Sequence, residues 1–186
     1  MIKNMTEIKK SAILNVADLM ATAALTAPKA SGHDTIRTAI ITGEEKDALR
    51  DKMIKLGETF GQENFRRDAG NVDRSECVVL IACTGRFFGM SNCSLCGYED
   101  CRANRNAGGK CAITVTDLGV AVGSAASVAA DNRVDNRIMY TAGKAAIKLG
   151  YLPDEADICY GIPLAAESKN IFFDRGPGAV INLSKE

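Results

Sequence analysis

Four cysteines lie within nineteen residues of this chain, in a segment rich in Gly, Asn and Ser. They are Cys93, Cys96, Cys101 and Cys111, with the spacing Cys-x2-Cys-x4-Cys-x9-Cys. Thiolates are soft, strongly donating ligands, and four of them in a short segment can surround a zinc ion or the irons of an iron–sulfur cluster. The spacing therefore predicts one metal site that uses all four side chains as ligands.

The spacing leaves two alternatives for the metal. Structural zinc sites commonly combine two close Cys-x2-Cys pairs, whereas only Cys93 and Cys96 form such a pair here. The wider separation of Cys101 and Cys111 is typical of iron–sulfur ligands. We therefore expect an iron–sulfur cluster, and the alternative is a structural zinc in a non-enzymatic binding protein. The sequence assigns no catalytic side chain, substrate or redox partner.

Length and composition restrict the class of protein. A chain of 186 residues can bury roughly 70% of its unfolded surface, so we expect a single domain over residues 1–186. Lys plus Arg and Asp plus Glu both number 23, which argues against a nucleic-acid partner. We find neither a membrane-spanning run nor an export signal, and seven cysteines, an odd number, favour free thiols. We expect a cytoplasmic protein with no membrane partner.

The hydrophobic pattern predicts helices and strands on both sides of a cysteine-rich loop over residues 84–111. Apolar residues at intervals of three and four predict helices over 6–25, 42–56, 63–69, 116–131 and 135–149. Runs rich in β-branched residues predict strands over 35–41, 77–83 and 158–164. The run 77–83 lacks polar alternation, so both of its faces should be covered. These elements predict an α+β domain with a mixed central sheet flanked by helices.

Three further cysteines lie outside the loop. Cys77 and Cys83 are six residues apart in a predicted strand and therefore share one face of it. We interpret both of them, together with Cys159, as small apolar residues of the core, which is the usual place of a free cysteine. Other roles for these three thiols stay open.

The predicted helix over 116–131 carries a ridge of small residues. Gly119, Gly123 and Ser127 follow one another at intervals of four and therefore lie on one side of the helix. Glycine weakens a helix unless something needs the space, so the ridge predicts close packing against another helix. That helix belongs either to this chain or to a second subunit. The alternative is direct contact between the ridge and the flat ring of a cofactor.

Several segments of the chain together resemble a prokaryotic family of uncharacterised ferredoxin-domain proteins. The segments are 27–32, the cysteine loop, 117–125, 131–140, and 161–164 continuing to 170–175. The resemblance covers nearly the whole chain. It implies iron and sulfur at the four loop cysteines.

The order of elements is also similar to that of the nitroreductase superfamily. An N-terminal helix leads to the Ala27-Pro28 turn, a strand, a helix, an apolar strand, a small-residue helix and a last strand that contains Gly-x-Pro. This resemblance implies a nitroreductase-like fold, a homodimer and flavin mononucleotide (FMN) at the subunit interface. It places Lys29 and Arg175 as partners of the flavin phosphate. It also implies electron transfer coupled to a flavin-dependent reduction.

Overall fold

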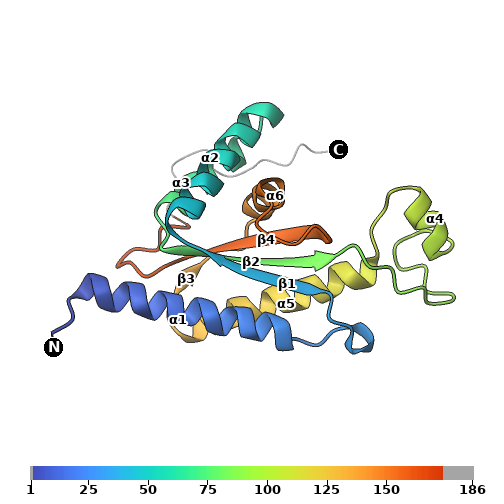
Figure 1. The fold of residues 1–186 in the computed structure, drawn as a ribbon, viewed down its shortest axis with the longest axis horizontal. Helices are drawn as coiled ribbons and strands as arrows, with labels where there is room; N and C mark the ends of the chain where they lie inside the picture. The colour runs from blue at the N-terminus through green and yellow to red at the C-terminus, as the bar shows by residue number, and fades with distance from the viewer. Residues whose placement is uncertain (1, 174–186) are drawn as a thin grey trace.

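The computed structural model describes residues 2–173, and Figure 1 shows their arrangement. The elements in chain order are α1 (Met5–Thr26), the short 3-10 turn η1 (Ala30–Gly32), β1 (Ile36–Ile41), α2 (Gly43–Phe60), α3 (Glu63–Asp73), β2 (Cys77–Thr84), α4 (Cys101–Asn106), α5 (Ala112–Asp131), β3 (Asp135–Asn136), α6 (Tyr140–Leu149) and β4 (Ala156–Ala165). The strands predicted over 35–41, 77–83 and 158–164 are confirmed.

A four-stranded sheet in the order β1-β2-β4-β3 forms the middle layer. Helices α1 and α5 cover one face, and α2, α3 and α6 cover the other (Figure 1). The predicted α+β class, with helices flanking the sheet, is therefore confirmed. The predicted mixed sheet is wrong for the described strands, because all three pairings are antiparallel. Helices α2 and α3 pack against each other and return the chain to the sheet, so β2 begins beside the end of β1 and runs antiparallel to it.

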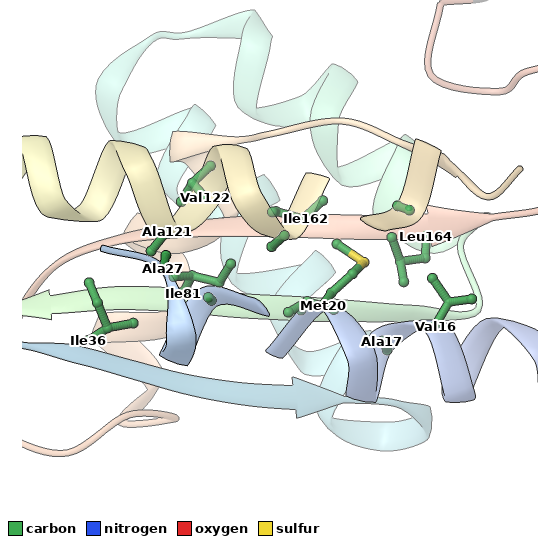
Figure 2. Close-up of a cluster of buried hydrophobic side chains, with 14 of the residues drawn as sticks. Val16, Ala17, Met20, Ala27, Ile36, Ile81, Ala121, Val122, Ile162 and Leu164 are labelled. Atoms are coloured by element: carbon green, nitrogen blue, oxygen red, sulfur yellow. The ribbon is translucent and has the colours of Figure 1, made fainter. Parts of the chain in front are cut away.

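Strand β2 is the centre of the core. Cys77, Val79, Ile81 and Cys83 point into the layer formed by α1 and α5, and the alternate residues 78, 80 and 82 point toward α2, α3 and α6. Figure 2 shows Ile81 in the first layer, near Met20 of α1. The prediction that both faces of this strand are covered is confirmed. Cys77 and Cys83 share a face as predicted, and Cys159 lies in the opposite core layer.

Helix α5 begins four residues earlier than the sequence pattern predicts. In residues 2–173 it is the one helix long and apolar enough to cross a membrane, judged by length and composition alone. Its side chains Leu118, Ala121 and Ala125 are buried against α1 and the sheet. Gly119 and Gly123 are instead exposed, and a Cβ on either would meet nothing within 4 Å. The small-residue ridge therefore makes no close contact within the described chain.

The segment 135–149 is a helix only in its second part. Asp135 and Asn136 form β3, which pairs with the end of β4, and Met139 forms an isolated bridge to Gly161. Helix α6 begins after this bridge, at Tyr140. The predicted start at Asp135 is wrong because strand pairing takes the backbone groups that a helix would use.

Helix α6 approaches β4 so closely that two glycines are required. A Cβ on Gly143 would lie 1.8 Å from the backbone oxygen of Cys159. A Cβ on Gly161 would lie 2.7 Å from the Cβ of Ala142. Real Cβ atoms do not approach other atoms so closely, so a side chain at either position forces α6 and β4 apart.

We predict that Gly143→Ala lowers the free energy of unfolding by about 1–3 kcal/mol, because the added methyl meets backbone that cannot rotate away. The matched control is Gly70→Ala, at an exposed position of α3 where an added Cβ meets nothing within 4 Å. It should leave stability unchanged or raise it by about 0.5–1 kcal/mol through helix propensity. Urea unfolding measures both. Equal stabilities for the two variants would contradict this account of the α6–β4 contact.

Candidate metal centre

The cysteine-rich segment connects β2 to α5 and extends beyond the end of the sheet (Figure 1). Within it lies the short helix α4, whose first residue is Cys101. The Asp100 side chain caps this helix by accepting a hydrogen bond from the Ala103 N–H at 2.7 Å. Cys111 directly precedes α5 and stands at its N-cap. Two of the four predicted ligands are therefore held at the starts of helices.

The Cys93–Cys96 pair lies on a tight turn. The Gly97 N–H donates to the Ser94 carbonyl at 2.9 Å, which closes the turn around Cys96. Ser94 has a φ of 44° and Gly97 a φ of 82°, both in the left-handed region. Such conformations let a chain reverse direction within a few residues. The turn places the two thiols on the wall of one pocket.

All four predicted ligands line the same pocket. The cavity itself is small, about 20 Å³, and it opens to solvent. The rest of the wall is largely apolar or aromatic and includes Phe87, Phe88, Met90, Leu95, Tyr98 and Ile113. Cysteines distributed over nineteen residues therefore converge on one place in the structure.

The four cysteines line one pocket, but their side chains are not gathered around a single point. Within residues 2–173, no three His, Cys, Asp or Glu side chains are arranged to hold one metal ion. Zinc requires all its sulfur ligands at about 2.3 Å from one centre. A cluster distributes its thiolates over several irons bridged by sulfide. The donor set is chemically suitable for both kinds of centre, and the positions of the thiols do not select one of them.

Cys111 is the most buried of the four, with 9% of its surface exposed. Burial by itself would raise the pKa of this thiol. Hydrogen bonds from the backbone N–H groups of Thr114, Phe88 and Ile113 outweigh burial and lower the pKa. The helix N-terminus thus favours the thiolate, the form that binds metal.

The three cysteines of the core behave differently. Burial raises the pKa of Cys77 to about 12, that of Cys83 to about 11 and that of Cys159 to about 12. Backbone hydrogen bonds at Cys83 and Cys159 do not outweigh the loss of solvent, as those at Cys111 do. These thiols stay protonated near neutral pH and fill space, in agreement with their interpretation as core residues.

Two kinds of contact attach the cysteine loop to the body of the protein. The Lys110 ammonium forms an ion pair with Asp157 near the start of β4. The Thr114 hydroxyl of α5 donates to the Arg86 carbonyl at 2.8 Å. In addition, the Arg105 guanidinium lies over the Phe87 ring, 4.9 Å from its centroid. The loop is therefore attached to the rest of the protein near both of its ends, at Arg86 and at Lys110.

Lys29 does not lie free to bind a phosphate. Its ammonium donates to the carbonyls of Ala24, Leu25 and Ala27 at the end of α1, where a helix leaves carbonyls without partners. The neighbouring Ala30 N–H points to the buried carboxylate of Asp117, at 3.1 and 3.2 Å from its two oxygens. The structure thus uses these donors within the chain, and the role of Lys29 toward a flavin phosphate stays a prediction. The other predicted partner, Arg175, lies outside the described residues.

Sequence reasoning missed four residues of the pocket region. Asn104 is fully buried and lines the pocket, and Gly109 packs against its side chain. A signal was present, because Asn104 follows Cys101 by one helical turn and Gly109 belongs to a Gly-Gly pair before Cys111. Phe87 and Phe88 were missed too, since apolar residues in an irregular segment carry no periodicity.

The fold defined by these layers is that of the nitroreductases. A nitroreductase from Lactococcus lactis, CinD, solved in complex with nicotinic acid, matches 90% of this chain and 81% of its own, with a TM-score of 0.59 and 13% identity. A putative nitroreductase from Desulfovibrio desulfuricans, solved in complex with FMN, matches 92% of this chain and 84% of its own, with a TM-score of 0.57 and 15% identity. At such identities the likeness shows the fold alone.

Sequence comparison gives the family. Residues 107–175 match the model of a family described as uncharacterized proteins containing a ferredoxin domain. A protein from Archaeoglobus fulgidus is 40% identical over 186 residues, which cover 95% of this chain and 99% of that protein. The chain belongs to this family, as its sequence segments predicted. The matched region contains Cys111 but begins after the other three loop cysteines.

We predict that thiol labelling of the folded, metal-free protein separates the two groups of cysteines. Iodoacetamide at pH 8 should modify Cys93, Cys96 and Cys101, which are partly exposed. The three core cysteines should stay unmodified, because thiols with pKa values of about 11 to 12 are ionised in roughly one molecule in a thousand to one in ten thousand at that pH. Their thiolate fraction rises with pH, so labelling should increase toward pH 11. Peptide mass spectrometry locates the label, and core labelling at pH 8 in folded protein would contradict the burial described above.

Proposed function

We propose that this protein is an iron–sulfur redox protein that transfers electrons, with Cys93, Cys96, Cys101 and Cys111 as the cluster ligands. The observation that carries the proposal is the convergence of these four thiols on one pocket. The family description, which names a ferredoxin domain, supports the same chemistry. The nitroreductase-like fold supports a redox function more generally.

A bound cluster would supply one-electron oxidation and reduction. The four thiolates would hold it, and aromatic and apolar side chains form most of the remaining pocket wall. The N–H groups that point at the Cys111 sulfur stabilise negative charge there, which is one way a protein sets a reduction potential. Met90 and Leu95 are 54% and 71% exposed on the pocket wall, so the outer side of this wall is where a redox partner could approach.

Flavin is left out of the proposed reaction. Solved proteins of this fold contain FMN, which favours a flavin-dependent reduction coupled to the cluster. Against it, the Lys29 ammonium is occupied by three carbonyls of its own chain. A yellow supernatant after heating purified protein would show that flavin binds through other residues.

We also propose that the protein acts as a homodimer in the cytoplasm. The exposed residues Val115, Gly119, Gly123 and Ser127 follow one another at intervals of four along α5. This ridge of mostly small residues suits the close approach of a second helix. All seven cysteines are free, which agrees with a reducing compartment.

The proposed cluster predicts that protein purified without air is brown and contains iron and acid-labile sulfide. Cys96→Ser should remove most of the iron, because a hydroxyl is a poor substitute for a thiolate ligand. The matched control is Cys159→Ser in the core, where the Cys159 thiol contacts the Tyr160 carbonyl and a serine hydroxyl can do the same. This control should keep the iron content of the wild type. Metal and sulfide analysis with visible absorbance measures all three proteins.

Two results would contradict the cluster. Colourless wild-type protein with one zinc per chain would establish the structural-zinc alternative and a non-enzymatic binding protein. Equal iron in wild type and Cys96→Ser would show that the ligand assignment is wrong.

The proposed dimer predicts that Gly123→Glu shifts the protein to the 19.8 kDa monomer, because a carboxylate would be buried between the subunits. Gly70→Glu is the matched control, since Gly70 is an equally open helical position on the other side of the sheet. Sedimentation velocity reports the masses. A wild-type monomer, or a dimer that Gly123→Glu leaves intact, would exclude this surface as the interface.

A further inference from the structure

We propose that Asn104 is a positioning residue that sets the separation of the ligands Cys101 and Cys111, and that it does so through its contact with Gly109. The inference rests on the proposed function, because it concerns how the same four-cysteine pocket is held. Asn104 lies on α4 one turn after Cys101 and is fully buried. It lines the pocket together with the four cysteines.

Two hydrogen bonds join Asn104 to the residues that directly precede Cys111. The Asn104 side-chain Nδ2 donates to the Lys110 carbonyl at 2.8 Å. The Gly109 N–H donates to the Asn104 backbone carbonyl at 2.9 Å. These bonds fix the path of the chain between α4 and α5. Since Cys101 begins α4 and Cys111 precedes α5, they fix the relative placement of two ligands.

Gly109 is required by this contact. A Cβ at Gly109 would lie 1.9 Å from the Oδ1 of Asn104 and 3.3 Å from a ring carbon of Tyr98. Its neighbour Gly108 has a φ of 70°, whereas Gly109 does not adopt the left-handed conformation, so its need for glycine comes from packing alone. The amide of Asn104 thus rests directly on the backbone of Gly109.

The Asn104 side chain is costly for the fold, which argues for a role beyond filling space. Its Oδ1 is buried without a hydrogen-bond partner, and such atoms are rare because they lose contact with water and gain nothing in return. Turning the amide over would not help, because Oδ1 would then face the Lys110 carbonyl. The other polar side chains of α4, Arg102, Arg105 and Asn106, are exposed. Among the polar side chains of this helix, only that of Asn104 is buried.

The test compares how strongly anaerobically purified variants hold their iron. The variants are Asn104→Ala, Gly109→Ala and the double variant, and the probe is a ferrous chelator such as ferrozine in excess. Substitutions beside a metal site typically lower metal affinity by about 10- to 100-fold, and we expect iron retention to fall on that scale in both single variants. The cluster's electron paramagnetic resonance (EPR) spectrum in the reduced state should change as well, because the ligands move relative to the irons.

Matched controls separate positioning from general stability. Asn106→Ala makes the same chemical change two residues away on the exposed side of α4, and Gly70→Ala makes the same change as Gly109→Ala in open space. Both should keep wild-type retention and EPR spectrum. The double variant should be no worse than Asn104→Ala, because removal of the amide makes room for the methyl group added at position 109.

Wild-type iron retention and EPR spectra in Asn104→Ala and Gly109→Ala would overturn the inference and leave the proposed function standing. Additive losses in the double variant would also overturn it, since the two residues would then act independently. If circular dichroism shows that Asn104→Ala is unfolded, Asn104→Asp keeps the shape, replaces the donor to Lys110 by a carboxylate oxygen that cannot donate, and carries the same expectation. If the wild type holds no iron, the proposed function fails by itself. Cobalt(II) titration then tests the contact between Asn104 and Gly109. The inference predicts weaker thiolate-to-cobalt absorbance in Asn104→Ala than in the wild type.

Discussion

Removal of β2 from water on both of its faces is the constraint on which the rest of the structure depends. Every residue from Cys77 to Cys83 is buried, so this strand needs a helical layer on each side. Helices α1 and α5 supply one layer, and α2, α3 and α6 supply the other. The same strand ends where the cysteine loop begins, and α5 begins where the loop ends. Strand β2 and helix α5 thereby determine where the loop starts and ends.

Within that frame the loop is organised by local chemistry rather than by a core of its own. Turn residues place Cys93 and Cys96, the start of α4 places Cys101, and the N-terminus of α5 places Cys111. The N–H groups around Cys111 favour its thiolate, whereas the cost of burial dominates at the core thiols. The pKa of Cys111 and the pKa values of the three core thiols are thus shifted in opposite directions. Their difference comes from the balance of backbone hydrogen bonds against burial and not from their position in the sequence.

Much of this could be predicted from the sequence, because the strongest signals were local. The apolar run of β2 and the stripes of α1 and α2 depend on periodicity, and the Cys-x2-Cys turn depends on spacing. Strand direction could not be read in this way, since pairing depends on how α2 and α3 return the chain. The contacts of Lys29 could not be predicted either, because a resemblance does not show that the ammonium donates to the carbonyls at the end of α1. Asn104 was missed because its contact with Gly109 exists only in three dimensions.

The central claim is that four thiolates from one loop hold a cluster of iron and sulfide. X-ray absorption at the iron edge of anaerobically purified protein tests it most directly, because it reports the atoms around each metal. The account predicts iron surrounded by sulfur, with a second shell of scattering from neighbouring irons. Absence of that iron–iron shell, or zinc surrounded by four sulfurs in its place, would contradict the account.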